Sequence, residues 1–200
     1  MERRFEAKKQ ELFTLYERFG RESSPFRQQA FCKAGCSFCC TFMGNVDILT
    51  LEGLVILEHI RGIPRESQET LRKKISENMT LKKNRQKPPC PFLDEHNTCL
   101  IYGVRPFSCR QLYSVRECGG SGGPMTHRQA VESARSAVEE LQRLDDTGYS
   151  GHISYVLHLL EEPSFRRLYL SGGFAPEQIM SFGKAHGLII NRTAKSRANG

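Results

Sequence analysis

The sequence predicts a small, mainly α-helical domain that is interrupted by irregular cysteine-rich loops. Apolar residues recur at helical spacing in several segments, whereas no segment alternates between apolar and polar residues as a half-buried strand would. A stretch over residues 87–118, rich in proline and cysteine, separates two helical parts. The chain has 200 residues, which suits one domain with a hydrophobic core. We therefore expect a single unit over residues 1–200.

The first predicted helix covers residues 5–19. Its apolar residues follow the i, i+3, i+4, i+7 pattern that places them on one face of a helix. These residues are Leu12, Leu15, Tyr16 and Phe19. Gly20 is expected to end the helix, so that residues 21–27, which include Pro25, form a polar connector.

Further helices are expected on both sides of the loop-rich stretch. Thr50 suits the N-cap position of one helix, which Gly62 ends, and the next helix covers residues 66–83. Periodic apolar residues then predict a C-terminal helical part over 124–187, followed by a frayed tail over 191–200. Within the C-terminal part, helices are expected over residues 125–144, 153–160, 163–170 and 176–187.

The composition restricts the compartment and the kind of partner. No apolar run reaches the roughly 18 residues that a membrane span needs, and the first ten residues are charged and lack the apolar block of a secretory signal. We therefore expect a cytoplasmic protein without a membrane partner. The formal net charge of +7 is compatible with a nucleic-acid partner. Metal-bound thiolates would offset part of this charge, so nucleic-acid binding is not the favoured hypothesis.

Eight cysteines form the most informative pattern in the chain. The first four follow a C-x3-C-x2-C-C spacing, and eight or nine residues separate the members of the second four. In a reducing compartment, thiols at such short spacings are more often metal ligands than disulfides. The candidate ligands are Cys32, Cys36, Cys39, Cys40, Cys90, Cys99, Cys109 and Cys118.

Thiolate ligands favour zinc or an iron–sulfur cluster over magnesium or calcium, and the spacing does not decide between the two. The eight cysteines can form two four-cysteine zinc sites, one four-iron cluster with spare thiols, or one cluster and one zinc site. If only four of them bind metal, we expect Cys36, Cys39, Cys90 and Cys109. The neighbours Cys39 and Cys40 point in different directions on an extended chain, so they can serve different sites.

The cysteine motif resembles that of the YkgJ-type cysteine-cluster proteins, which are described as zinc- or iron-chelating domains. The resemblance rests on the spacing of Cys32 to Cys40, on Cys-Pro-Phe-Leu at 90–93 and on the run from Cys99 to Arg110. It covers residues 32–118 and implies a metal held by cysteines. The same domain occurs in flagellin lysine N-methylases, so the resemblance also implies an alternative: an iron–sulfur-dependent enzyme that modifies proteins.

Three residues within the motif are expected beside the metal-bound sulfur atoms. Arg105 and Arg110 can offset the negative charge of the thiolates and donate hydrogen bonds to them. The alternative for Arg105 is a helix cap or an ion pair with Asp94 or Glu95. Tyr102 is expected to pack beneath the cluster together with the apolar residues Phe92, Leu93, Ile101 and Phe107.

Three functions remain open from the sequence. A binding module would use closed metal sites to support a surface for a protein partner. A cluster-dependent enzyme would need an open metal position near Tyr102 and Arg105, and we find no catalytic fingerprint for it. A metal carrier or sensor would need exchangeable metal. His96 is an alternative ligand because it lies between Cys90 and Cys99.

Overall fold

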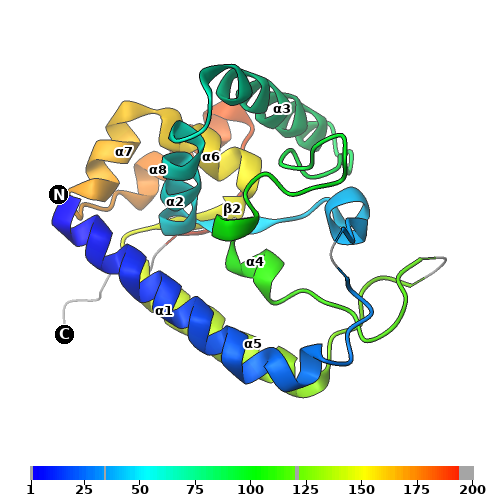
Figure 1. Cartoon of the computed structure of the whole chain (residues 1–200). Helices are drawn as coiled ribbons and strands as arrows, with labels where there is room; N and C mark the ends of the chain where they lie inside the picture. The colour runs from blue at the N-terminus through cyan, green and yellow to red at the C-terminus, as the bar shows by residue number, and fades with distance from the viewer. Residues whose placement is uncertain (1, 34, 120–121, 194–200) are drawn as a thin grey trace.

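The computed structural model describes residues 2–33, 35–119 and 122–193, and it is mainly α-helical (Figure 1). This confirms the predicted fold class. The order of elements places irregular loops between the N-terminal and C-terminal helices, as expected. Within the described residues, no helix is both long enough and apolar enough to cross a membrane.

Helix α1 covers Glu2–Arg27, so the prediction that it ends at Gly20 was wrong. Pro25 lies inside the helix, near its C-terminal end. The packing of α1 beside α5 (Arg128–Leu144) explains the difference (Figure 1). The second half of α1 makes specific contacts with α5, including a 2.6 Å hydrogen bond from Ser133 Oγ to Glu22 Oε2. Such tertiary contacts outweigh the weak local preference of glycine and proline against helix.

Helices α2 (Thr50–Arg61) and α3 (Arg65–Lys83) lie where the sequence predicted them. The predicted cap was wrong, because Thr50 is the first residue of α2 and its side chain does not bond to the helix terminus. Its hydroxyl donates to the carbonyl oxygen of Tyr149 at 3.0 Å and accepts from the amide of Tyr149 at 2.8 Å. The hydroxyl therefore joins α2 to a strand.

The C-terminal part is helical, as predicted. After α5 follow α6 (Ile153–Glu161), α7 (Pro163–Leu170) and α8 (Pro176–His186). The loop-rich stretch contains only a 3-10 turn at Tyr102–Val104 and the short helix α4 (Phe107–Arg110), and a π-helical turn covers Cys39–Met43.

A small antiparallel sheet was not predicted. Its strands are β1 (Asp47–Leu49), β2 (Tyr149–His152) and β3 (Ile190–Thr193), in the order β1-β2-β3. Strands of three or four residues are too short to produce an alternating pattern, so they could not be detected from the sequence. Residues 191–193 of the expected frayed tail belong to β3, and residues 194–200 lie outside the described part of the chain.

Helix α2 connects the two large clusters of the hydrophobic core. Ile56 and Ile60 pack in the cluster that contains α6, whereas Leu51 and Val55 pack in the cluster between α1 and α5. Gly53 permits the close approach of α2 to α6, because a Cβ atom there would lie 2.7 Å from Leu160 Cδ1. The backbone of α2 therefore lies against α6 in direct contact.

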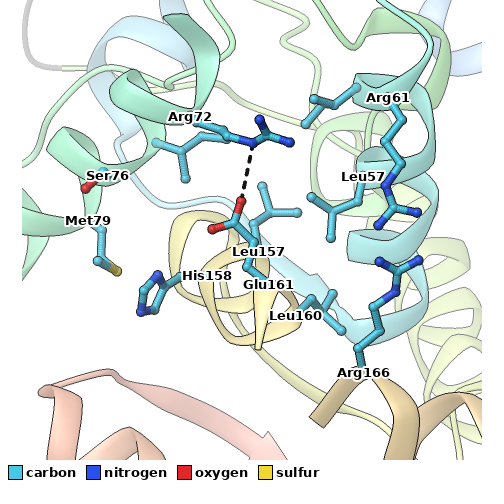
Figure 2. Close-up of a pocket in the computed structure, with 12 residues that line it drawn as sticks. Leu57, Arg61, Arg72, Ser76, Met79, Leu157, His158, Leu160, Glu161 and Arg166 are labelled. Atoms are coloured by element: carbon cyan, nitrogen blue, oxygen red, sulfur yellow. Dashed lines mark ion pairs between the residues drawn. The ribbon is translucent and has the colours of Figure 1, made fainter. Parts of the chain in front are cut away.

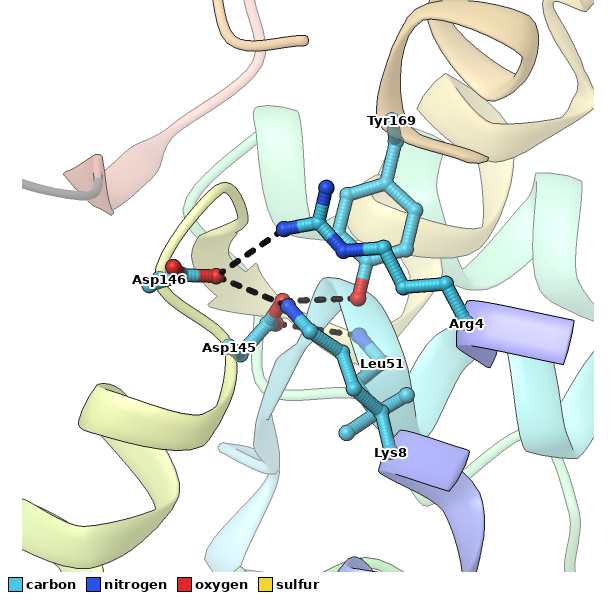
Figure 3. Close-up of polar contacts among 6 residues, drawn as sticks. All are labelled: Arg4, Lys8, Leu51, Asp145, Asp146 and Tyr169. Carbon is cyan, nitrogen blue, oxygen red and sulfur yellow. Dashed lines mark hydrogen bonds and ion pairs between the residues drawn. The ribbon is translucent and has the colours of Figure 1, made fainter. Parts of the chain in front are cut away.

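Two neighbouring aspartates, Asp145 and Asp146, tie four helices together (Figure 3). Asp145, which follows α5, is 3% exposed and accepts hydrogen bonds from the Leu51 amide of α2 at 3.0 Å and from the Tyr169 hydroxyl of α7 at 2.7 Å. The neighbouring Asp146 binds Lys8 Nζ of α1 at 2.8 Å. Burial raises the pKa of Asp145 to about 6, although the hydrogen bonds from Leu51 and Tyr169 oppose the rise.

This raised pKa makes a testable prediction for the Asp145→Asn variant. The folded chain holds the Asp145 proton more tightly than the unfolded chain, so the group favours folding at low pH, and this contribution is lost as the pH rises from about 4 to about 6. A shift of about two pKa units corresponds to roughly 3 kcal/mol. We expect the difference in free energy of unfolding between wild type and Asp145→Asn to change by about that amount between pH 4 and 7.

Denaturant unfolding of both proteins across this pH range measures the difference. Glu139→Gln, which changes an exposed carboxylate of α5, is the matched control and should leave the pH profile unchanged. A constant difference between wild type and Asp145→Asn would contradict the assignment.

Candidate metal centre

All eight candidate cysteines lie in the described part of the chain, and none forms a disulfide. Cys36 is exposed and the others are partly buried. They come from the loop after α1, the π-helical turn, the loops around α4 and α4 itself. The fold therefore brings together residues that are more than 80 positions apart in the sequence.

One set of thiols, the first cysteine group, contains Cys32, Cys36, Cys39 and Cys118. The pKa of Cys39 is raised to about 12, first by burial and then by the nearby thiols of Cys32 and Cys118. The pKa of Cys32 is raised by burial and also by Cys36 and Cys118. Such electrostatic coupling requires proximity, so these four side chains lie in one neighbourhood.

The remaining thiols, the second cysteine group, are Cys40, Cys90, Cys99 and Cys109. Burial raises the pKa of Cys109, and the other three thiols of the group raise it further. The pKa of Cys90 is raised to about 12, first by burial and then by Cys40 and Cys99. Cys40 also interacts with Cys36 and Cys39 of the first group, so the two groups are neighbours.

Backbone hydrogen bonds hold the cysteine segments together. The amide of Cys90 donates to the carbonyl oxygen of Cys40 at 2.7 Å, which joins the π-helical turn to the loop after α3. In the first group, the amide of Ser114 donates to Cys32 Sγ at 3.3 Å, and the amide of Phe31 donates to the carbonyl oxygen of Ser114 at 2.8 Å. Long-range contacts of this kind hold the loops in position, although the loops have no large hydrophobic core of their own.

Two cysteines of the second group also accept backbone hydrogen bonds. The amide of Phe92 bonds to the sulfur of Cys90, and the amide of Ile101 bonds to the sulfur of Cys99. Each cysteine also begins a tight turn, in which Leu93 N lies 3.1 Å from Cys90 O and Tyr102 N lies 3.2 Å from Cys99 O. An amide that points at sulfur stabilises the thiolate, which is the form that binds metal.

A small cavity lies where the two cysteine groups meet. It has a volume of about 10 Å³, and its lining includes Cys39, Cys40, Cys90 and His152. A space of this size admits a single water molecule or ion. Burial lowers the pKa of His152 to about 4, so its ring is neutral at pH 7. Its Nδ1 accepts from the amide of Ser154 and its Nε2 lies 3.2 Å from Gly44 O, so this histidine caps α6 and contacts a backbone carbonyl.

The thiols are close together, but their sulfur atoms do not yet converge on a metal position. Among residues 2–33, 35–119 and 122–193, no three Cys, His, Asp or Glu side chains converge closely enough to hold one metal ion. Binding by either group therefore requires side chains and loops to move closer. The donor set itself fits a soft metal, because each group offers four sulfur atoms.

Arg105 and Arg110 lie near the thiols of the second group. The charge of Arg105 lowers the pKa of both Cys40 and Cys99 against the effect of burial. Arg110 donates to the carbonyl oxygens of Arg105 and Gly103, each at 2.8 Å. In the described residues Arg105 forms no ion pair with an acidic side chain, and its Nε is buried without a hydrogen-bond partner.

Tyr102 was expected beneath the cluster and is instead 63% exposed. The reason is its contact with Arg105, whose guanidinium lies 4.0 Å from the centre of the Tyr102 ring. An aromatic face attracts a cation, so the ring covers the arginine from the solvent side. Phe92, Ile101 and Phe107 are buried, as predicted.

Sequence reasoning missed two residues that support this region. Arg27 donates to the carbonyl oxygen of Arg110, and its Nε is buried without a partner. It was overlooked because residues 21–27 were assigned to a connector. Glu52 is 4% exposed and accepts hydrogen bonds from the amide of Phe107 at 2.7 Å, the amide of Leu49 at 2.9 Å and the hydroxyl of Tyr16 at 2.5 Å. Its position three residues after Leu49, at the start of a helix, was the available signal.

His96 does not join either group. Its side chain is 80% exposed and lies 3.6 Å from the carboxylate of Glu95. The four ligands expected if only four cysteines bind metal do not fall in one group. Cys36 and Cys39 lie in the first group, and Cys90 and Cys109 lie in the second.

The site combines free thiols that lie close together, backbone amides that point at sulfur, and neighbouring arginines. These features are typical of cysteine-rich metal-chelating domains. The chain belongs to the CxxCxxCC family, described as a "putative zinc- or iron-chelating domain", whose profile matches residues 31–141. This confirms the family resemblance that the motif indicated and supports metal chelation by cysteine. Neither the comparison with curated proteins nor the comparison with solved structures found a match.

The raised thiol pKa values predict that metal binding releases protons. At pH 7 thiols with pKa values of about 12, such as Cys39 and Cys90, carry their protons, and a metal must displace them. We expect release of about one proton per coordinating thiol and weaker binding as the pH falls. Calorimetric titration of the metal-free chain with Zn²⁺, in buffers of different ionisation enthalpy, counts the protons.

The Cys90→Ala variant should release about one proton fewer, whereas the Ser37→Ala control should behave as wild type. Binding that releases no protons and does not depend on pH would show that these thiols are not the ligands.

Proposed function

We propose that this protein binds two metal centres, each through four cysteine thiolates. Cys32, Cys36, Cys39 and Cys118 would hold one centre, and Cys40, Cys90, Cys99 and Cys109 would hold the other. The observation that carries the proposal is the division of eight free thiols into two neighbouring groups of four. Four thiolates are the usual complement of a structural zinc site and also of an iron–sulfur cluster.

The fold supports a structural contribution from the bound metal. The segment from Pro88 to Gly119 has only short helical turns, and backbone hydrogen bonds and a few buried apolar side chains hold it in place. When bound, a metal supplies cross-links between such loops, and its binding free energy adds to the stability of the fold. The protein's own residues present the sulfur atoms, direct amides at them and exclude water with Phe92, Ile101 and Phe107.

The arginines beside the second group support an anionic centre. Four thiolates around a divalent ion leave a net charge of −2, which nearby cations stabilise. Arg27, Arg105 and Arg110 gather at this position, and burial together with their mutual repulsion lowers the pKa of Arg27 and Arg110. An anionic centre would relieve this repulsion and would provide a partner for the buried Nε of Arg105.

The remaining functional expectations extend this proposal. Free thiols that bind metal suit a reducing cytoplasm, which is the proposed compartment. A protein partner is more compatible with this role than a nucleic acid. The protein-modifying reaction that the resemblance implies stays a prediction, and metal binding is the function proposed here.

Anaerobic purification followed by measurement of zinc, iron and acid-labile sulfide tests the proposal. We expect about two zinc ions per chain, or one cluster for each group that binds iron. The Cys32→Ser/Cys118→Ser variant should lose only the first centre, and the Cys40→Ser/Cys109→Ser variant only the second. Ser37→Ala, a change in the same loop, should retain both.

Two results would contradict the proposal. Wild-type protein without zinc or iron after reconstitution would exclude metal binding. Loss of all metal in both double variants, with the fold retained by circular dichroism, would indicate one shared centre instead of two.

Arg105 provides a further test of the second centre. We expect Arg105→Met to weaken metal binding there about tenfold, which is roughly 1.4 kcal/mol, because an unpaired positive charge near the thiolates is lost. Arg105→Lys should recover part of the affinity. Competition with a chromophoric chelator measures the effect, and Arg116→Met, at an exposed arginine, is the control. Equal affinities in wild type and Arg105→Met would rule out this electrostatic role.

A further inference from the structure

A second cavity lies away from the cysteines, between α2, α3, α6 and the first turn of α7 (Figure 2). Its volume is about 480 Å³, which is within the range of small-molecule sites. None of its lining residues belongs to either cysteine group. It therefore needs an explanation independent of metal binding.

The floor of this cavity is part of the hydrophobic core. Ile60 of α2, Ile75 of α3, and Leu157 and Leu160 of α6 line it, and all four belong to the largest buried cluster. Leu57 and Met79 extend the apolar surface. An apolar surface of this kind favours an alkyl or aromatic body over a fully hydrated ligand.

The rim carries an excess of positive charge. Arg61 of α2 and Arg166 of α7 point toward one another in Figure 2, and no carboxylate among the described residues lies within ion-pair distance of either. The third arginine, Arg72, has a partner, because its Nε lies 3.8 Å from Glu161 Oε1. Three arginines against one glutamate leave the lining with a net charge of +2.

The other polar groups of the lining do not cancel this charge. Burial lowers the pKa of His158, so its ring is neutral at pH 7, and Ser76 is uncharged. Arg61 repels Arg166, and together with burial, which is the larger effect, it lowers the pKa of Arg166. An anion between the two guanidinium groups would remove this repulsion and accept their hydrogen bonds.

We propose that this cavity binds an anionic amphiphile, with its carboxylate or phosphate head between Arg61 and Arg166 and its apolar body on Leu57, Ile75 and Met79. The arginine pair selects the negative head, and the apolar side chains of the lining select the apolar body. A neutral amphiphile of the same length would lack the first interaction, and inorganic phosphate would lack the second.

Methyl NMR of the full metal-loaded chain tests the proposal. The protein contains five methionines, and of the four that the structure describes only Met79 lines the cavity. We expect decanoate, below its micelle concentration, to shift the Met79 methyl signal saturably while the signals of Met43 and Met125 stay in place. Decyl phosphate replaces decanoate in a parallel titration to distinguish the two kinds of head, and decanol serves as the neutral probe.

Charge variants separate recognition of the head from nonspecific apolar contact. Arg61→Gln and Arg166→Gln should each weaken binding of the anionic probe at least tenfold, whereas Arg167→Gln, on an exposed neighbour outside the cavity, should not. Binding of either decanoate or decyl phosphate with this dependence supports the proposal and identifies the head. Failure of both to shift Met79, or equal binding of decanol and the anions in all variants, overturns it.

Discussion

The buried carboxylate of Glu52 is the interaction on which the arrangement of this protein depends. It accepts hydrogen bonds from three donors that belong to different parts of the chain: the Tyr16 hydroxyl of α1, the Leu49 amide before α2 and the Phe107 amide that begins α4. Burial raises its pKa, and these donors oppose the rise by stabilising the charged form. Because Phe107 lies two residues before Cys109, the same carboxylate that joins two core helices also positions a candidate metal ligand.

Helix α2 links the two candidate sites. Its first turn, through Glu52, supports the cysteine loops, and its last turns contribute Leu57, Ile60 and Arg61 to the second cavity. The close contact at Gly53 holds this helix against α6, which forms much of the cavity floor. A well-packed central helix therefore supports both regions, although the loops that carry most of the cysteines have little regular structure.

The sequence predicted those elements that depend on local residue patterns. Helical periodicity located α2, α3 and the C-terminal helices, and the cysteine spacing identified the family. The extension of α1 through Gly20 and Pro25 depends on packing against α5, and the short strands depend on pairing between distant segments, so neither leaves a local signal. The same limit applies to the site: the motif supplied the eight cysteines, but only the folded chain shows which thiols are neighbours and places Arg27 beside Arg105.

The chain order of the two proposed cysteine groups has a consequence for assembly. The second group lies, in sequence, entirely between Cys39 and Cys118 of the first, so the loops that the two metals would close are nested. Closing the outer loop alone joins sites about 80 residues apart. Once the inner centre links Cys40 to Cys109, the remaining path is only about 10 residues, and the entropic cost falls by about 2 kcal/mol. The path from Cys40 to Cys109 shortens in the same way once the outer centre is filled, so each metal would lower the entropic cost of binding the other and uptake of the two would be cooperative.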